Sequence, residues 1–477
     1  MKKYDYDVVI IGAGIGGLIC ANYLIQSGLK VAIVEQHFQV GGYCTSFQRK
    51  GYNFDIGVHY LSGIKRGVLG KILKELKLHN VCSFVQHDPT DKVILPEHTF
   101  CLRANPQDTI GEFKKAFPKQ SHQLDQFFSF ILQNEFLNIY RQVKKATFRE
   151  LLDRYFDDER LKGSLNVLLG GMGLSAKEAS AIAATVLFRE YILDMGYAPL
   201  EGMQKFPNQL AENFKRQKGD LFLSSRVVEI AHDASQAKSV TLEDQRTISA
   251  KIFVSNSDVR NLFAKLLKGN LPESKAVKSL ISSPSFFVVC LGQKENLKPK
   301  IKINNTIWCS TYSEMNYFQI PEIDLIEAKV PLLICSSSLN KGKESLRLLA
   351  FAPYSNKNFW KTNQKIIADN LVKLADQNSI LLKNNVEILA IATPHTYEKY
   401  TSNYKGAAFG WALIPTQIRS SVMPNITSIS NLYLTGHWTT GGLGQMGASG
   451  ASISGRKVAE MIIRKTRKKW NHGIIRT

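Results

Sequence analysis

The first 35 residues predict a strand, a helix and a second strand in close succession. Residues 7–11 end in an unbroken apolar run, which is typical of a parallel strand buried on both faces. A helix is then expected as far as Ser27, with Gly28 as its stop. Residues 30–34 form a second apolar run, which ends at Glu35. The chain is therefore expected to begin with a β-α-β unit.

The C-terminal region has a similar order of patterns. Residues 431–436 predict a strand that ends in Gly436, and a glycine-rich turn follows over 441–447. Residues 448–463 then have helical spacing, with small residues first, so that backbone N–H groups at the helix start can face an electron-rich group. Too little chain remains after this helix for a second complete β-α-β unit, so no separate nicotinamide domain is expected.

The middle of the chain changes its pattern twice. Residues 61–190 look mostly helical, and an aromatic stripe over 124–137 is interpreted as core, with a tunnel wall or lipid-facing surface as the alternative. Residues 265–395 mix helical stretches with strand-like runs such as 286–291 and 332–335. This mixture predicts a sheet that is covered by helices.

The turn after the first strand carries candidate chemistry, because its glycines have G-x-G-x-x-G spacing. Gly12 permits a tight turn, Gly14 lets the backbone approach a pyrophosphate at the helix N-terminus, and Gly17 permits close helix packing. Glu35 stands where a carboxylate can accept hydrogen bonds from ribose hydroxyls. The glycines alone are a weak signal, but the strand, helix and acidic residue around them together indicate a bound dinucleotide.

Composition places the chain among ordinary globular proteins. Its 477 residues are 44% hydrophobic and 21% charged, which excludes a disordered chain, a collagen and a coiled coil. The seven cysteines include no C-x-x-C pair, so we expect no metal site and a reduced, cytoplasmic location. No apolar run reaches the roughly 18 residues that span a bilayer, and acidic residues interrupt the N-terminal stretch, so secretion is not expected.

The formal net charge of +21 points to an anionic partner, which can be nucleic acid, a membrane surface or an acidic substrate. No helix-turn-helix, zinc-finger or RNP pattern accompanies the charge, so nucleic acid is not expected. Basic residues are densest over 464–469. This cluster is either a solvated tail beyond the last helix or a patch for anionic lipid, and we expect peripheral contact with an anionic membrane.

Residues 34–61 resemble a known family. The pattern combines Glu35-Gln36-His37, Gly41-Gly42, Cys44, Phe54-Asp55, Gly57 and His59-Tyr60. It is similar to the superfamily of FAD-dependent carotenoid desaturases, carotenoid isomerases and retinol saturases, related to phytoene dehydrogenase, and most similar to the retinol saturase branch. Many relatives carry Arg at the position of Tyr43. The resemblance implies FAD as cofactor and an α/β fold with a Rossmann-type FAD-binding domain and a mixed-sheet and helical substrate domain.

The resemblance also implies a division of the chain. Residues 1–65, 195–265 and 400–477 are expected to form the FAD-binding domain, and residues 66–194 and 266–399 the substrate-binding or cap domain. The glycine motif and the resemblance together predict these cofactor-binding residues: Gly12, Ala13, Gly14, Gly16, Gly17, Glu35, Gln36, Gly41, Gly42, Tyr43, Val228, Gly436, Met446 and Gly447.

The resemblance implies a lipophilic substrate, a long apolar polyene such as a retinoid, a carotenoid or a related isoprenoid. The His59-Tyr60 match favours saturation or redox-neutral cis–trans isomerisation over desaturation. Flavin chemistry leaves the protein mainly to position its substrate and keep it dry, so few catalytic side chains are expected. The candidates are His59, Tyr60 and His437, the last because a histidine can change charge near neutral pH. The electron partner stays open.

Three alternatives stay open at this point. The first is a carotenoid desaturase, and the second is an amine oxidase-like flavoenzyme, which oxidises a C–N bond with the same FAD elements. The third is a prenyl-binding escort resembling the GDP dissociation inhibitors, which binds a lipidated GTPase and catalyses nothing. The intact glycine motif and Glu35 argue against the escort.

Overall fold

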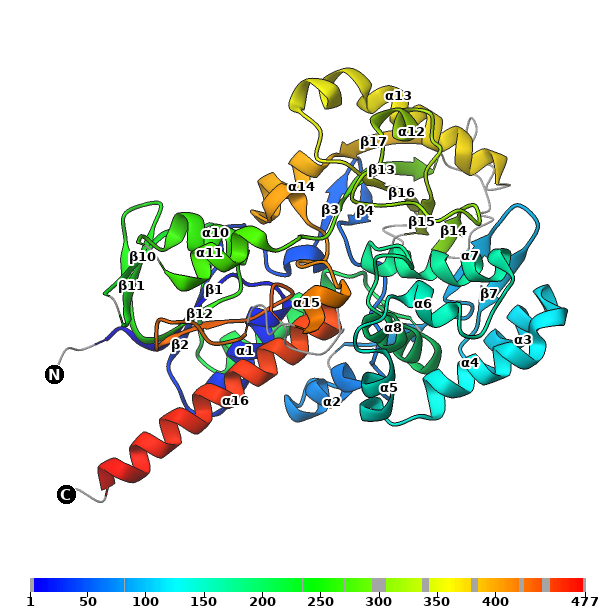
Figure 1. Ribbon diagram of the computed structural model, residues 1–477. Helices are drawn as coiled ribbons and strands as arrows, with labels where there is room; N and C mark the ends of the chain where they lie inside the picture. The colour runs from blue at the N-terminus through cyan, green and yellow to red at the C-terminus, as the bar shows by residue number, and fades with distance from the viewer. Residues whose placement is uncertain are drawn as a thin grey trace.

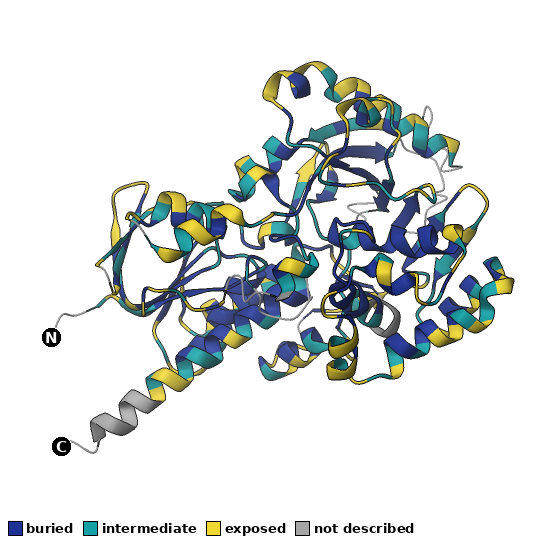
Figure 2. Cartoon of the chain, viewed as in Figure 1, coloured by how far each residue is buried: buried dark blue, intermediate teal, exposed yellow. Residues whose placement is uncertain are grey.

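The computed structural model describes residues 4–80, 82–194, 196–233, 235–269, 271–293, 306–336, 343–378, 385–419, 424–439 and 447–474. Two seven-stranded sheets and a group of helices make up this part of the chain (Figure 1). The strands of both sheets are mostly buried, whereas the outer helices carry exposed residues (Figure 2).

The first sheet has the strand order β10-β11-β12-β1-β2-β9, and β18 also pairs with β12. Its strands are β1 (Tyr6–Ile11), β2 (Val31–Val34), β9 (Asp220–Phe222), β10 (Val227–His232), β11 (Ala237–Leu242), β12 (Thr247–Ser255) and β18 (Leu432–Leu434). The pairs of β1 with β2 and β12, of β2 with β9 and of β12 with β18 are parallel. Together with α1 (Ile15–Gln26), β1 and β2 form the predicted β-α-β unit.

Both faces of the first sheet are covered, as an apolar central strand requires. Val8 and Ile10 of β1 pack into one cluster with α1 and α16 (Gly447–Ile474). Val9 and Ile11 pack into a second cluster on the opposite face. Helices α1 and α16 lie side by side (Figure 1).

Helix α16 is longer than the sequence pattern predicts. It continues to Ile474, because Lys and Arg are good helix formers and the next glycine is Gly473. The basic cluster over 464–469 therefore lies on the helix and is not a tail beyond it. Lys465 donates hydrogen bonds from Nζ to the carbonyl of Ser430 at 2.8 Å and to the Tyr433 hydroxyl at 3.2 Å.

The second sheet is mixed, with the order β17-β13-β16-β15-β14-β6-β7. Its strands are β6 (Asp91–Ile94), β7 (Thr99–Leu102), β13 (Ser285–Gln293), β14 (Thr306–Cys309), β15 (Leu332–Ser336), β16 (Ser345–Ala352) and β17 (Val386–Ala392). Among the described strands of this sheet, only the β14–β6 pair is parallel. Helix α13 (Lys357–Gln377) and α12 (Glu322–Ile326) cover one face of this sheet.

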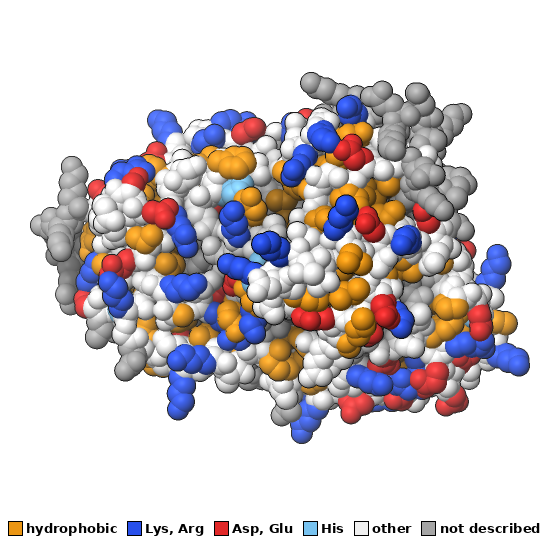
Figure 3. Space-filling view, turned by 90° about the horizontal axis from the view of Figure 1, so that it is seen from above, with side chains coloured by type: hydrophobic (Ala, Val, Ile, Leu, Met, Phe, Trp, Pro, Cys, Tyr) orange, Lys and Arg blue, Asp and Glu red, His pale blue; other side chains and the backbone are white. Residues whose placement is uncertain are grey.

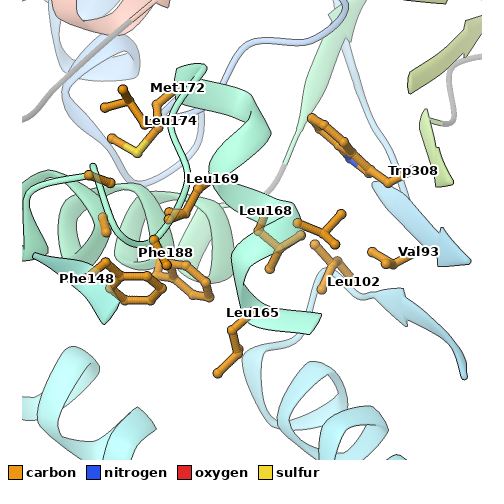
Figure 4. Packing of buried hydrophobic residues seen from close by; sticks show 14 of the residues in the cluster. Val93, Leu102, Phe148, Leu165, Leu168, Leu169, Met172, Leu174, Phe188 and Trp308 are labelled. Carbon is orange, nitrogen blue, oxygen red and sulfur yellow. The ribbon is translucent and has the colours of Figure 1, made fainter. Parts of the chain in front are cut away.

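The helical group packs against the other face of the second sheet. It comprises α3 (Pro106–Ala116), α4 (Ser121–Gln133), α5 (Phe136–Val143), α6 (Phe148–Leu152), α7 (Glu159–Val167) and α8 (Ala181–Asp194). Figure 4 shows Phe148 of α6, Leu165 of α7 and Phe188 of α8, which belong to one cluster with Trp308 of β14. Phe127 and Phe128 are buried, as the core interpretation of the aromatic stripe requires. Leu137 is 63% exposed, because the stripe breaks and a new helix, α5, begins at Phe136.

Shorter elements connect these layers. They are α2 (Val68–Glu75), α9 (Lys205–Arg216), α10 (Val259–Asn261), α11 (Pro272–Ser279), α14 (Pro394–Thr401), α15 (Pro415–Arg419), the hairpin of β3 (Ser46–Arg49) and β4 (Tyr52–Asp55), and the pair of β5 (Phe84–Gln86) and β8 (Tyr197–Pro199). Within the described ranges, no helix has the length and apolar character needed to cross a membrane.

The strands of the first sheet come from residues 1–65, 195–265 and 400–477, and those of the second sheet from 66–194 and 266–399. The α/β fold class with two mixed layers is as expected from the sequence. The exact boundaries between an FAD-binding and a substrate domain stay a prediction.

Candidate functional site

A cavity of about 1220 Å³ extends from the first sheet to the second. Its wall on the first sheet includes the glycine turn after β1, the end of β2 and part of β10. Its wall on the second sheet comes from β13, β14, β15 and β16. This volume exceeds the several hundred Å³ typical of a pocket for one small ligand, so the cavity has room for a cofactor and a substrate together.

The glycine turn is shaped so that no side chain fits at its key positions. Gly12 has a φ of +97°, which side-chain-bearing residues rarely adopt. A Cβ on Gly17 would lie 2.2 Å from the Gly12 carbonyl oxygen, so helix α1 can approach β1 only without one. A Cβ on Gly14 would lie 2.8 Å from Nδ2 of Asn256. These three glycines therefore leave bare backbone at the N-terminus of α1.

Glu35 lies at the end of β2, where its carboxylate joins two neighbouring segments. Its Oε2 accepts a hydrogen bond from the Ala13 N–H at 2.7 Å, and its Oε1 accepts one from the His37 N–H at 2.8 Å. Burial raises the pKa of Glu35, while these N–H groups act in the opposite direction. The Ala13 carbonyl in turn accepts a hydrogen bond from the Gly41 N–H at 2.9 Å. Ala13 therefore shapes the turn, and its own N–H is already engaged.

The second glycine pair lies directly against the first motif. Gly41 has a φ of +123° and forms an isolated parallel bridge with Gly14. A Cβ on Gly41 would approach Cγ of Pro207 to 2.9 Å. Gln36 connects the same wall to the segment after α14, because its Oε1 accepts a hydrogen bond from the Ser402 hydroxyl at 3.1 Å. The residues expected at one cofactor are thus brought together by the fold.

Three aromatic rings form the next part of the cavity wall. The ring centroid of Tyr43 lies 5.9 Å from that of Tyr397 and 5.8 Å from that of His437. The Tyr43 hydroxyl donates a hydrogen bond to the Ala407 carbonyl at 2.8 Å. Burial raises the pKa of Tyr43 to about 12 and lowers the pKa of His437 to about 4. Both groups are therefore uncharged at neutral pH, and His437 does not titrate near pH 7 as the sequence suggested.

The predicted pair His59 and Tyr60 also lines the cavity. The two rings meet edge to face, with centroids 4.5 Å apart. Burial, together with the nearby positive charge of Arg347, lowers the pKa of His59 to about 3. Burial also raises the pKa of Tyr60. His59 and Tyr60 thus present a neutral imidazole and a neutral phenol to the cavity.

The remaining predicted residues border the cavity at other points. Val228 lies on β10 and is 38% exposed. Gly436 has a φ of +91°, and a Cβ on Gly16 would lie 2.9 Å from its Cα. Gly447 begins α16 with a φ of +60°. Met446 lies outside the described residues.

Some cavity residues were not predicted from the sequence. Asn256, at the end of β12, donates a hydrogen bond from Nδ2 to the Gly12 carbonyl at 3.3 Å. Tyr397 lies on α14, and its hydroxyl donates to the Ile56 carbonyl at 3.1 Å. The position of Asn256 directly after an apolar run was the available signal, whereas nothing local marks Tyr397. Apolar residues of the second sheet, Val288, Trp308, Leu333 and Leu349, complete the wall.

This arrangement fits FAD by its chemistry. Bare backbone at a helix N-terminus suits a diphosphate, and a partly buried carboxylate at the end of the second strand suits ribose hydroxyls. The apolar wall of the second sheet suits a hydrophobic substrate that reacts with the flavin. Among the described residues, no cluster of three or more His, Cys, Asp or Glu side chains could hold a metal ion.

Comparison with known proteins agrees with this geometry. Residues 15–463 match the family described as flavin containing amine oxidoreductase. The chain is 22% identical to the all-trans-retinol 13,14-reductase of Danio rerio, covering 91% of this chain and 82% of the relative. It is 23% identical to the chloroplastic prolycopene isomerase of Arabidopsis thaliana, covering 98% and 85%. It is 22% identical to the zeta-carotene-forming phytoene desaturase of Myxococcus xanthus, covering 96% and 93%.

Solved structures share the fold. An oxidoreductase from Methanosarcina mazei has a TM-score of 0.69 at 18% identity, over 95% of this chain and 99% of that chain. A putrescine oxidase variant has a TM-score of 0.64 at 17% identity, over 96% and 99%. The sequence-based assignment to an FAD-dependent superfamily of the desaturase and saturase type is confirmed. The chain belongs to the flavin-containing amine oxidoreductase family and is an FAD-dependent oxidoreductase.

Proposed function

We propose that this enzyme acts on the carbon–carbon bonds of a long apolar polyene, by saturation or by redox-neutral cis–trans isomerisation. The substrate class is a retinoid, a carotenoid or a related isoprenoid. The observation that carries the proposal is the apolar second-sheet wall of a cavity whose other wall fits FAD. The names of the three relatives, which concern retinol, prolycopene and phytoene, support the same class.

We propose that the wall on the first sheet holds the cofactor. The residues proposed to bind it are those predicted from the sequence, of which Met446 lies outside the described residues: Gly12, Ala13, Gly14, Gly16, Gly17, Glu35, Gln36, Gly41, Gly42, Tyr43, Val228, Gly436, Met446 and Gly447. Bound FAD supplies the transfer of hydride or electrons to and from substrate carbon. Glu35 would accept hydrogen bonds from the ribose hydroxyls, while the glycines leave room for the diphosphate.

The protein residues around the substrate would act by position and by exclusion of water. Trp308, Leu333 and Leu349 offer apolar surface along which an extended chain can lie. We propose that His59, Tyr60 and His437 complete this chamber close to the cofactor wall. Because His59 and His437 stay neutral well below pH 7, they can donate or accept hydrogen bonds there without placing a charge beside an apolar chain.

Product analysis under anaerobic conditions tests this proposal. Enzyme whose flavin has been reduced beforehand is incubated with all-trans-retinol, with prolycopene and with phytoene, and the products are separated by chromatography. A saturated or isomerised product supports the proposal. Conversion that occurs only with oxidised enzyme would indicate the desaturase alternative. A separate aerobic assay uses oxidised enzyme and putrescine, so that dioxygen can reoxidise the flavin. Peroxide release there, with no change in any polyene in the anaerobic assay, would indicate amine oxidation and overturn the proposal.

We further propose that the enzyme makes peripheral contact with an anionic membrane. Phe38 is 68% exposed and Tyr400 is 54% exposed. Both border the cavity, and their ring centroids lie 4.3 Å and 6.2 Å from that of His37. Lys399 is exposed next to them. Figure 3 shows hydrophobic side chains in and around a hollow on one face of the molecule, with Lys and Arg side chains among them. Such a surface could take an apolar substrate from a bilayer.

Sedimentation with liposomes tests this contact. Vesicles that contain phosphatidylserine should bind the protein at low salt and release it at high salt, because exposed charges are screened. Replacement of both Phe38 and Tyr400 by Ser should weaken binding. The matched control replaces Leu137 and Ile323, which are similarly exposed elsewhere, and should bind as the wild type does. Equal loss in both double variants would contradict a specific contact at the cavity.

A further inference from the structure

One fully buried cation lies behind the cavity and takes no part in the function proposed above. Arg347 of β16 has an exposed fraction of 0%, and none of its three guanidinium nitrogens has a hydrogen-bond acceptor among the described residues. No carboxylate in the same part of the chain lies within the 4.0 Å of an ion pair with it. Buried charges in proteins are ordinarily paired, so this arginine points to a ligand that carries the missing partner.

The register of the second sheet fixes where Arg347 lies. Its cross-strand neighbours are Cys290 of β13 on one side and Cys335 of β15 on the other. Leu349, two residues further along β16, lines the cavity, and residues two apart on a strand share a face of the sheet. Cys290 lines the cavity as well. The Arg347 side chain therefore lies on the cavity-facing side of the sheet, although Arg347 is not itself one of the residues that line the cavity.

Asp91, the carboxyl group in the cross-strand row of Arg347, does not neutralise it. Asp91 lies in the same cross-strand row, because Thr306 pairs with both Cys335 and Asp91. Burial raises the pKa of Asp91 to about 8, so this carboxyl is mostly protonated at neutral pH, and it accepts its hydrogen bond from Nε1 of Trp308 at 2.8 Å. The positive charge of Arg347 acts instead on His59 and Tyr397, which both line the cavity.

His59 supplies a second unused polar group at the same place. Its Nε2 atom is buried and has no hydrogen-bond partner in the described part of the chain. The imidazole lines the cavity and lies within the electrostatic reach of the guanidinium. A buried cation and a neutral hydrogen-bonding group thus lie within electrostatic reach of each other on the cavity side of the second sheet.

We propose that Arg347, with His59, recognises a carboxylate at one end of the substrate, so that the substrate is a polyene acid. A guanidinium matches a carboxylate with two parallel N–H···O bonds. The proposal requires the long Arg347 side chain to turn from its buried position towards the chamber. The apolar row of Val288, Leu333 and Leu349 then carries the hydrocarbon chain. The same positive charge disfavours a cationic amine. This inference rests on the proposed action on polyenes.

Ligand binding to the wild-type holoenzyme tests the inference directly. The probes are all-trans-retinoic acid and its methyl ester, which share a hydrocarbon chain and differ in the charge of one end. Quenching of tryptophan fluorescence gives both dissociation constants, with detergent and pH held fixed. We expect the acid to bind at least about tenfold more tightly than the ester. Equal affinity for the two, or tighter binding of the ester, would overturn the inference.

Two variants and a control locate the effect. Arg347→Met should lose the preference for the acid while it still binds the ester, and Arg347→Lys should keep part of the preference. The control Arg49→Met removes an exposed cation that also borders the cavity, and it should leave the ratio of the two dissociation constants unchanged. Flavin content and thermal unfolding show whether each variant is folded. If Arg347→Met does not fold, the wild-type ratio decides the matter.

The outcomes separate this inference from the proposed function. Turnover of retinol or a hydrocarbon carotenoid without any preference for an acid would leave the function in place and reject the role of Arg347. Turnover or binding of no polyene at all would reject both. Loss of acid preference in Arg49→Met as well as in Arg347→Met would also reject a specific role, because it would indicate a general effect of charge.

Discussion

At the scale of single residues, Glu35 shows how one carboxylate serves both the fold and the expected cofactor. Its carboxylate accepts hydrogen bonds from the backbone N–H groups of Ala13 and His37, at the turn that carries the glycine motif. Hydrogen bonds to a charged group each contribute about 1.5–3 kcal/mol. Substitution by Gln keeps the shape but removes the charge, so the turn loses much of this stabilisation.

We therefore expect Glu35→Gln to retain FAD about tenfold more weakly than the wild type. Equilibrium dialysis of the flavin-stripped protein against FAD measures the change. Glu243→Gln is the matched control, because Glu243 is exposed and also borders the cavity. Unchanged affinity in Glu35→Gln would show that Glu35 only shapes the turn.

His437 gives a second expectation at this scale, which concerns pH. The unfolded imidazole takes up a proton below about pH 6.5, whereas burial delays this in the folded protein until about pH 4. Between these values the unfolded state binds more protons, so the free energy of unfolding falls as the pH falls. For His437 the loss amounts to at most about 3 kcal/mol, and the buried His59 acts in the same direction.

Urea unfolding of the holoenzyme at pH 7, 6, 5 and 4.5 measures this loss. His437→Gln should show a smaller loss over the interval, because Gln does not titrate. His122→Gln, a substitution at an exposed position, serves as the control for the change of side chain. A pH dependence in His437→Gln equal to that of the wild type would contradict a buried neutral imidazole at this position.

At the scale of elements, close contact between α1 and α16 depends on glycine. A Cβ on Gly455 of α16 would lie 2.3 Å from the carbonyl oxygen of Gly16 and 3.1 Å from the backbone nitrogen of Cys20. Both contacts are with backbone, which cannot move aside as a flexible side chain can. The N-terminal glycine turn and the C-terminal helix therefore hold each other in place.

Gly455→Ala is expected to lower the free energy of unfolding by about 1–3 kcal/mol, since it overpacks this contact. Denaturant titration of the holoenzyme measures the change. The control is Gly111→Ala on α3, where an added Cβ meets nothing within 4 Å. That substitution should stabilise the protein by up to about 1 kcal/mol. Equal stability of Gly455→Ala and the wild type would mean that the two helices separate easily.

Elements that depend on a short stretch of sequence could be predicted, whereas features that depend on contacts between distant segments could not. The β-α-β unit and the spacing from Gly12 to Glu35 depend on a local pattern of about two dozen residues, and the sequence predicted both. Asn256 and Tyr397 reach the cavity, and Arg347 reaches its place on the cavity-facing side of the second sheet, only through strand pairing and packing between distant segments. The register of strand pairing depends on which face of each strand is buried, and this cannot be determined from a single sequence. The aromatic stripe over 124–137 was interpreted as one helix for a similar reason, although α4 ends at Gln133 and α5 begins at Phe136.

At the scale of the whole molecule, the cavity is lined by both sheets. One wall belongs to the first sheet and the opposite wall to the second, so a ligand that fills the cavity contacts both. A ligand that binds only the folded state stabilises it by mass action. The cofactor is therefore expected to stabilise the second sheet as well as the sheet that carries the glycine turn.

Removal and return of FAD tests this coupling. FAD at one hundred times its dissociation constant should raise the free energy of unfolding of the stripped protein by about 2.7 kcal/mol. Hydrogen exchange should then show slower exchange of amides in β1 and β2 and also in β13 and β16. Adenosine diphosphate, which lacks the flavin, should protect the first pair and leave the second pair unchanged. Protection of the first sheet alone by FAD would mean that the second sheet folds independently of the cofactor, with its chamber shaped before FAD arrives.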